Sequence, residues 1–232
     1  MSQAALLPNV VRDFERVGRD IVAAAAKFPS SILADVAGRR GALSGRIAPL
    51  DPAMRVAGPA LTVEVRPGDN LMIHAALALA QPGDVIVVDG KGDLSCALMG
   101  EIMVQQCLAL GVAGVVIDGA VRDSEAIRAL GFPMFAAGRN PNGPTKGVAG
   151  RINWPIGCGG VSVQPGDLIV GDADGVVVIE RRQAAALLPL AADKLAAESK
   201  RIADIKARKQ LRPAWLDDAL RAAGVLGAGE TL

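Results

Sequence analysis

Apolar positions near the beginning of the chain recur at helical intervals. Steps of three and four residues place them on one face of a helix, so the pattern predicts a helix over Val10–Phe28. Pro29 interrupts the pattern, and Ser30 or Ser31 can cap a second short helix that ends near Arg39. The positions that carry the first helix are Val10, Phe14, Val17, Ile21 and Ala24 or Ala25.

The pattern changes between Ala60 and Ile179, where short β-branched segments alternate with turn signals and Ala/Leu-rich segments. The runs VIVVD (85–89) and GVVID (114–118) are almost wholly apolar, which is typical of strands covered on both faces. The sequence therefore predicts an α/β core with parallel pairing, followed by a hairpin across residues 171–175. The predicted strands are Leu61–Val65, Val85–Asp89, Gly114–Asp118, Pro133–Ala136, Leu168–Val170 and Val176–Ile179, and the predicted helices are Asn70–Ala80, Ala97–Leu110 and Ser124–Leu130.

The sequence of the last part of the chain predicts helices only. A long helix is expected over Arg181–Lys209, and Pro213 stands at the start of a last short helix. The basic stretch KRIADIKARK (200–209) favours a solvated helix face over an RNA-contacting stripe. Because a helix outside the core often packs on a neighbouring subunit, we expect an oligomer. The expected single domain, 1–232, has an N-terminal helical part (1–59), a core (60–180) and C-terminal helices (181–232).

Composition excludes several classes of protein. The 232 residues are 51% hydrophobic and carry a formal net charge of +1, which rules out disorder and gives no basic surplus for a nucleic-acid or membrane surface. No apolar run is long enough to span a bilayer, and no signal peptide is visible. Three scattered cysteines form neither a disulfide framework nor a metal knuckle. We expect a cytoplasmic protein with reduced thiols.

Candidate chemistry is concentrated at Glu101 and the Arg122-Asp123 pair. Twenty residues, 102–121, separate the two positions, and they predict a helix followed by a strand. Such a return brings the end of the strand back to the start of the helix, at the edge where open α/β sheets bind ligands. We therefore expect the three side chains to converge on one small cleft.

Each of these residue types suits a particular ligand. The guanidinium fork of Arg122 matches a carboxylate, and Asp123 suits a hard divalent cation such as Mg²⁺, which keeps several waters. The alternative is that both residues cap the helix that begins at Ser124, with Asp123 at the positive end of its dipole. An isolated Arg-Asp pair favours capping, whereas the whole arrangement favours a ligand site.

With these residues the chain resembles the class II pyruvate aldolases that act on 4-hydroxy-4-methyl-2-oxoglutarate and 4-carboxy-4-hydroxy-2-oxoadipate, and their relatives among the ribonuclease E inhibitor proteins. The family pattern is an acidic residue, 20 residues and then Arg-Asp, present here as Glu101 and Arg122-Asp123. The resemblance runs from about Ser31 to the C-terminal helix. Supporting segments are GDNLMIHAAL (68–77), QPGDVIVVDG (81–90), GVAGVVIDGAVRD (111–123), GFPMFAAG (131–138) and PGDLIVGDADGVVVI (165–179).

The resemblance implies a swivelling β/β/α sandwich like that of phosphohistidine domains, assembled as a homotrimer or homohexamer. The implied reaction splits a 4-hydroxy-2-oxo acid into pyruvate and an oxo acid, an activity of aromatic compound degradation, with oxaloacetate decarboxylation as a side activity. Asp123 would bind Mg²⁺ or Mn²⁺ directly, and Glu101 and Glu198 of the partner subunit would contact the metal through water. Arg122 would hold the pyruvyl oxygens. The backbone that would line the substrate site is Gly100, Glu101, Ile102 and Met103.

Other candidates are weaker. The run Asp89-Gly90-Lys91-Gly92-Asp93 resembles a nucleotide-binding glycine loop, but a lone glycine run favours a flexible loop beside the aldolase site. His74, the single histidine, has apolar neighbours at helical spacing, which favours a packed or pocket-rim residue over a catalytic base, and its role toward substrate stays open. Lys91 and Lys146 are candidates for a Schiff base, and Lys146 also for a substrate contact.

A rival interpretation comes from another class of protein. Ribonuclease inhibitors of the same fold act by docking on a large enzyme and need no metal. The intact Glu101, Arg122 and Asp123 favour the enzyme, because a pure binder has no physical need for that group. The scarcity of aromatic residues, 3% of the chain, also gives no sign of a protein-docking face.

Overall fold

A computed structural model describes residues 9–232 of the chain. The chain divides into two compact units, one that ends at Ala191 and one that spans Ala192–Leu232. The strands of the first unit are β1 (Ala48–Pro49), β2 (Val56–Glu64), β3 (Val85–Met99), β4 (Gly114–Val121), β5 (Met134–Arg139), β6 (Arg151–Ile152), β7 (Ile156–Cys158), β8 (Val161–Val163), β9 (Leu168–Asp172) and β10 (Gly175–Ile179). Its helices are α1 (Arg19–Ala25), α2 (Ser30–Val36), α3 (Leu71–Leu77), α4 (Glu101–Leu110) and α5 (Ser124–Leu130), and α6 (Arg181–Lys206) begins in it.

A parallel core of four strands forms the centre of the first unit. The sheet has the order β1-β5-β4-β3-β2-β9-β10, and β2, β3, β4 and β5 are paired in parallel. Ile86 of β3 stands in register with Leu61 of β2 and with Val115 of β4. The β-branched runs therefore form the covered strands that the sequence predicts. The hairpin between β9 and β10 is also as predicted, with Gly175 paired to Asp172.

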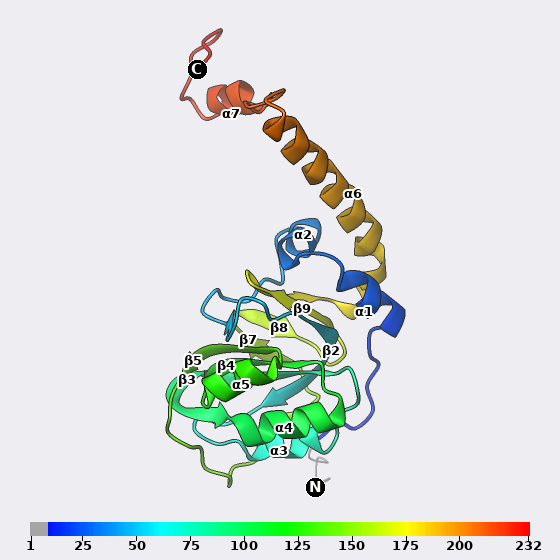
Figure 1. The fold of residues 1–232 in the computed structure, drawn as a ribbon, viewed down its shortest axis with the longest axis vertical. Coiled ribbons are helices and arrows are strands. Elements are labelled where there is room, and N and C mark those ends of the chain that lie inside the picture. The colour runs from blue at the N-terminus through cyan, green and yellow to red at the C-terminus, as the bar shows by residue number, and fades with distance from the viewer. Residues whose placement is uncertain (1–8) are drawn as a thin grey trace, which may run out of the picture. The chain divides into compact units, whose positions relative to one another are not determined.

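Alternate residues of these strands enter two separate cores. Leu61, Ile86 and Ile117 are buried on the face that helices α3, α4 and α5 cover, and Figure 1 shows these helices together on that side. Val85 and Val116 are buried on the opposite face, against apolar side chains of β7, β8, β9 and β10. Successive side chains of a strand point to opposite faces, so one run supplies both cores. The predicted α/β fold with β/β/α layering is confirmed.

The predicted first helix is wrong over most of its length. Only α1 is helical in Val10–Phe28. Val10 instead forms a bridge with Ile152, and the N–H of Val17 donates to the carbonyl oxygen of Gly166. Contacts with β6 and with the turn before β9 thus override the helical spacing of the apolar residues in this segment.

The other expected elements are present with shifted ends. The helix expected from Ala97 begins at Glu101, because Ala97 and Met99 still pair with β4 at the end of the long, bulged β3. Strand β2 begins at Val56, earlier than the predicted core. Helix α5 has the predicted bounds, and the short strands β1, β6, β7 and β8 were not expected.

The second unit continues α6 and contains α7 (Leu216–Ala222), as the sequence predicts for this part of the chain. The side chains of α6 that are buried, Ala184, Leu187 and Ala191, all belong to the first unit. Among residues 9–232, no helix has the length and apolar character needed to cross a bilayer.

Candidate functional site

The ends of β3 and β4 lie side by side and bring Gly100 next to Asp123. Met99 pairs with Val121, and the N–H of Arg122 donates to the carbonyl oxygen of Met99 over 3.0 Å. A Cβ at Gly100 would come within 2.4 Å of Asp123 Oδ2 and 2.9 Å of Arg122 Cγ. The absence of a side chain at Gly100 is therefore what leaves room for both groups.

The carboxylate of Asp123 turns toward α4 and away from its own helix. Asp123 is the N-cap residue of α5 and has a left-handed backbone, with φ 56°, but its side chain makes no capping hydrogen bond. Its Oδ2 instead accepts a hydrogen bond from the N–H of Glu101 over 3.0 Å. Capping of α5 thus does not explain the Asp123 carboxylate, which lies at the backbone of Glu101, whereas the convergence of the Glu101 side chain on the same cleft stays a prediction.

Arg122 lies alongside this carboxylate and is accessible to a ligand. Its Nε is 3.5 Å from Asp123 Oδ2, and the two side chains are 42% and 41% exposed. A Cβ at Gly143 would stand 3.1 Å from Arg122 Nη1, so the loop around Gly143 limits the guanidinium on one side. The long ion pair leaves most of the guanidinium donors available for a planar anion.

The amino end of α4 adds further donors. The first-turn N–H groups of a helix have no partner within it, and the end of the helix dipole there is positive. Ile102 is 77% exposed while Met103 and Gly100 are buried, so this end of the helix is accessible mainly at Ile102 and the half-buried Glu101. Arg122 and these N–H groups together suit an anionic ligand.

Two polar atoms of α3 and its N-cap lack the partners that buried atoms normally have. The side chain of Asn70 does not cap the helix, and its Nδ2 donates to the carbonyl oxygen of Leu98 over 2.8 Å. Asn70 Oδ1 and His74 Nε2 are buried and have no hydrogen-bond partner among the described residues. Buried polar atoms are usually paired, so these two atoms mark a place for ligand or water atoms. Sequence reasoning missed Asn70, because Asn before a helix is typical of a cap.

Lys146 belongs to a separate loop that pairs with the start of α3, through a bridge between Thr145 and Asp69. Burial, and then the positive charge of Lys146, lower the pKa of His74 below its ordinary value, so the imidazole is neutral at pH 7. His74 is half-buried on α3, and whether it is a packed or a pocket-rim residue stays open. The structure thus places the segment that carries Lys146 beside the start of α3, the helix of His74, which no sequence pattern indicated.

Glu198 belongs to the second unit. It lies on α6, where its Oε1 forms an ion pair with Lys194 Nζ over 2.9 Å, one helical turn away. Its expected role at the site of a partner subunit stays a prediction.

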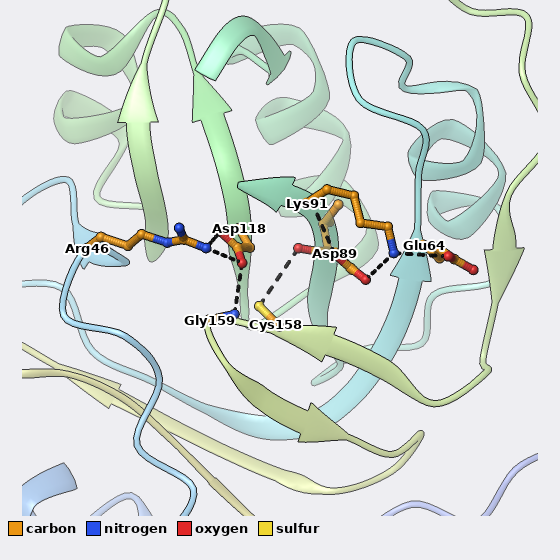
Figure 2. Close-up of polar contacts among 8 residues, drawn as sticks. Arg46, Glu64, Asp89, Lys91, Asp118, Cys158 and Gly159 are labelled. Atoms are coloured by element: carbon orange, nitrogen blue, oxygen red, sulfur yellow. Dashed lines mark hydrogen bonds and ion pairs between the residues drawn. The ribbon is translucent and has the colours of Figure 1, made fainter. Parts of the chain in front are cut away.

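Lys91 is held in an ion-paired cluster within β3, beside the end of β2 (Figure 2). Its Nζ lies 2.6 Å from Asp89 Oδ2 and 3.0 Å from Glu64 Oε1. Burial alone would lower the pKa of Lys91, but the two carboxylates outweigh it and raise the pKa. Lys91 therefore stays protonated and is a poor Schiff-base nucleophile. Asp118 on β4 forms a separate ion pair, with Arg46 Nη2 2.7 Å from its Oδ1.

The glycine run around Lys91 is not a nucleotide-binding loop. Residues 89–93 lie within β3, and no helix begins until Glu101. A phosphate-binding glycine loop needs a helix start directly behind it, to supply N–H groups.

A cavity of about 1010 Å³ opens at the other edge of the sheet, where the parallel strands begin. None of the predicted site residues lines it. Its buried carboxylates already have partners, since Arg16 binds Asp84 through two hydrogen bonds and Ser30 donates twice to Asp172. The two buried carboxylates of this cavity are thus already paired, and the candidate chemistry stays at Arg122 and Asp123.

Comparison with known proteins adds a family to this geometry. The family model described as "RraA-like: Aldolase/RraA" matches residues 20–178. A protein of Halalkalibacterium halodurans, named "Putative 4-hydroxy-4-methyl-2-oxoglutarate aldolase", is 43% identical over 182 residues, which are 78% of this chain and 87% of that protein.

Two solved structures have a similar fold. Streptomyces coelicolor RraAS2, described as an unusual member of the RNase ES inhibitor RraA protein family, has a TM-score of 0.75 and 29% identity, and covers 82% of this chain and 98% of its own. The RNA-processing inhibitor RraA from Thermus thermophilis has a TM-score of 0.60 and 30% identity, and covers 65% of this chain and 92% of its own.

Proposed function

Because the chain belongs to the RraA-like Aldolase/RraA family, we propose that it is a lyase that cleaves a 4-hydroxy-2-oxo acid to pyruvate and an oxo acid. Substrates of the proposed class are 4-hydroxy-4-methyl-2-oxoglutarate and 4-carboxy-4-hydroxy-2-oxoadipate, with oxaloacetate decarboxylation as a side activity. The observation that carries the proposal is the contact of Asp123 with the N–H of Glu101, beside an accessible Arg122. A carboxylate that only capped α5 would not accept a hydrogen bond from the N–H of Glu101.

The residues at this place fit a divalent cation. Asp123 Oδ1 makes no hydrogen bond or ion pair within the described part of the chain, and Gly100 leaves the space beside the carboxylate open. No group of three or more His, Cys, Asp or Glu side chains able to hold a metal occurs in residues 9–232. One or two carboxylates with water suit Mg²⁺ or Mn²⁺, which we propose as cofactor with Asp123 as direct ligand. Such a cation would supply Lewis-acid stabilisation of enolate charge.

Side chains and backbone groups of this chain perform the remaining steps. Arg122 and the first-turn N–H groups of α4 bind the carboxylate and oxo oxygens of the pyruvyl part and orient them. When the C4 hydroxyl loses its proton, the C3–C4 bond breaks and its electron pair enters the pyruvate enolate. Arg122 neutralises the developing enolate charge, and we assign acceptance of the hydroxyl proton to Glu101. Protonation of the enolate at C3 then gives pyruvate.

The distal half of the substrate extends toward α3 in our proposal. The unpartnered Asn70 Oδ1 and His74 Nε2, with the cation of Lys146 close by, suit a second carboxylate and a hydroxyl. A neutral imidazole accepts or donates a hydrogen bond without adding charge, whereas Lys146 supplies the charge.

Oligomeric assembly is part of the same proposal. We expect a homotrimer or homohexamer, in which Glu198 of the partner subunit contacts the cation through water. Light scattering of the purified protein tests the assembly, and Glu198→Gln tests the contact. A monomer that retains full activity would contradict both.

A second candidate function is binding of a ribonuclease without catalysis. The similarity to two RraA structures favours it, because one belongs to the RNase ES inhibitor RraA protein family, as an unusual member, and the other is named an RNA-processing inhibitor. The near-neutral net charge of +1 gives it no further support.

The deciding experiment measures pyruvate with a coupled dehydrogenase. The three substrates named above are offered with Mg²⁺, with Mn²⁺ and with EDTA. We expect metal-dependent pyruvate from at least one hydroxy-oxo acid. Activity on oxaloacetate alone would support the proposed site but show that the natural substrate is a different compound. No pyruvate from any of the three substrates would favour the ribonuclease-binding function.

A further inference from the structure

A strap of residues 140–148 spans the distance from Arg122 to α3. At the Arg122 end it is held by the last part of β3. Asn140 Nδ2 donates to the carbonyl oxygen of Leu94 over 2.7 Å, and the N–H of Ala97 donates to the carbonyl oxygen of Asn142 over 2.9 Å. Gly143 of the strap then lies against the Arg122 guanidinium. This end is thus fixed independently of α3.

The other end of the strap is held by the single carboxylate of Asp69. Oδ2 of Asp69 accepts hydrogen bonds from Thr145 Oγ1 at 2.7 Å, from the N–H of Gly147 at 2.7 Å and from that of Val148 at 3.2 Å. Its Oδ1 accepts a hydrogen bond of 3.0 Å from the N–H of Leu71, at the start of α3. Asp69 is only 2% exposed, so water cannot replace these bonds.

The Asp69 carboxylate is ionised in this environment. Burial alone would raise its pKa, but the four hydrogen bonds from the strap and α3 outweigh burial and lower the pKa below the ordinary value. Charge-assisted hydrogen bonds of this kind are stronger than neutral ones. The anion therefore joins two segments that are 76 to 79 positions apart in the sequence.

Lys146 lies between the residues that Asp69 holds. Its neighbours Thr145 and Gly147 both donate to the same oxygen, so the carboxylate fixes the backbone on either side of Lys146. The bridge between Asp69 and Thr145 fixes the strap against the segment that leads into α3 and His74. The position of Lys146 relative to His74 thus depends on Asp69.

We infer that Asp69 is a positioning residue that sets the specificity of the site, by holding the backbone around Lys146 at the start of the helix that carries His74, where the distal carboxylate of the substrate binds. The inference rests on the proposed function. It separates the site into two halves with different supports: Asn140 and Asn142 stabilise the Arg122 half, and Asp69 stabilises the Lys146 half. Loss of Asp69 should therefore affect long substrates and spare short ones.

The kinetic test compares two substrates on Asp69→Asn. An amide cannot accept from all four donors, because its NH₂ group faces at least one of them. We expect the KM for 4-hydroxy-4-methyl-2-oxoglutarate to rise about tenfold or more, as small misplacements of positioning groups do. For oxaloacetate, whose chain ends at C4 and lacks both the C4 hydroxyl and the C5 carboxylate, we expect kcat/KM within about threefold of wild type.

Asp172→Asn is the matched control. Asp172 is also a buried carboxylate with several donors, from Ser30 and the N–H of Asp174, but it lies at the other edge of the sheet. The Asp172→Asn variant should be less stable, but its kinetic constants for the two substrates should change by the same factor. Thr145→Val, which removes one donor to Asp69, should shift the KM in the same direction by less, and it serves if Asp69→Asn does not fold.

A second readout does not depend on activity. His74 is the single histidine of the chain, so its NMR titration is unambiguous. Release of the strap withdraws the Lys146 cation and exposes the imidazole, so the pKa of His74 should rise toward its ordinary value in Asp69→Asn and stay unchanged in Asp172→Asn.

The outcomes separate the two proposals. Equal losses on both substrates, or kinetics and a His74 titration equal to those of Asp172→Asn, would overturn the role of Asp69. A wild-type protein that releases no pyruvate from either substrate overturns the proposed function instead.

Discussion

The backbone N–H of Glu101 donates a hydrogen bond to Oδ2 of Asp123 over 3.0 Å, joining two residues that are 22 positions apart. The bond crosses from the first turn of α4 to the residue just after β4. It therefore ties together the helix start and the strand end on which the candidate site depends.

The close approach at this bond predicts that Gly100→Ala removes activity without unfolding the protein. A methyl group would lie 2.4 Å from Asp123 Oδ2 and must displace that carboxylate or Arg122. We expect a loss of about 10²-fold or more in kcat/KM for pyruvate release. Gly45→Ala is the matched control, because a Cβ there meets nothing within 4 Å. Equal activity of the two variants would show that the geometry at Gly100 is unimportant.

Arg122→Ala should cost about 10²-fold or more in turnover, as loss of a donor to a developing oxyanion does. Arg122→Lys keeps the charge but loses the planar fork, so it should recover only part of the rate. Steady-state kinetics on folded variants, checked by circular dichroism, measure both effects. Near-normal turnover of Arg122→Ala would remove this residue from the mechanism.

Stability against acid should depend on Asp172. Burial alone would raise the pKa of Asp172, but hydrogen bonds from Ser30 and Asp174 lower it below the ordinary value. A lowered pKa stabilises the folded protein at pH values above the ordinary value, near 3.8, and this stability is lost as the pH falls through the folded pKa. Asp172→Asn should therefore lower the unfolding free energy at pH 7 by about 1–3 kcal/mol and flatten its decline below pH 4. Urea unfolding between pH 3 and pH 7 measures the difference, and parallel curves for the two proteins would contradict it.

The thiols of Cys107 and Cys158 should be inert in the folded protein. Burial raises the pKa of each to about 12, with nearby carboxylates adding to the effect at Cys158. At pH 8 we expect iodoacetamide to label neither residue until a denaturant is added. Mass spectrometry of peptides from native and unfolded protein measures this, and rapid native labelling at either position would show that the core opens readily.

Much of this site could be predicted from the sequence, because it depends on local order along the chain. Glu101, Arg122 and Asp123 flank one helix and one strand, and such a return can close in only one way. The bounds of α5 follow from the same local signals, with Gly131 in a left-handed conformation at its end.

The support of the site could not be predicted. Asp69 and the strap are joined by hydrogen bonds between loops, and loops have no hydrophobic period that would indicate a partner. The helix predicted over Val10–Phe28 is wrong for a related reason, since a hydrogen bond to Gly166, in the turn before β9, holds Val17 outside the helix despite its helical spacing.

The most direct test of the central claim is the rate of pyruvate release by Asp123→Asn over a range of Mg²⁺ concentrations. The amide keeps the size of the side chain and an acceptor for Glu101 N–H, but it lacks the negative charge that a hard cation prefers. We predict that the wild type loses activity in EDTA and regains it with Mg²⁺, while the variant stays at least about 10²-fold slower at every concentration. A folded variant with wild-type rate and the same Mg²⁺ dependence would contradict the assignment of Asp123, and with it the site.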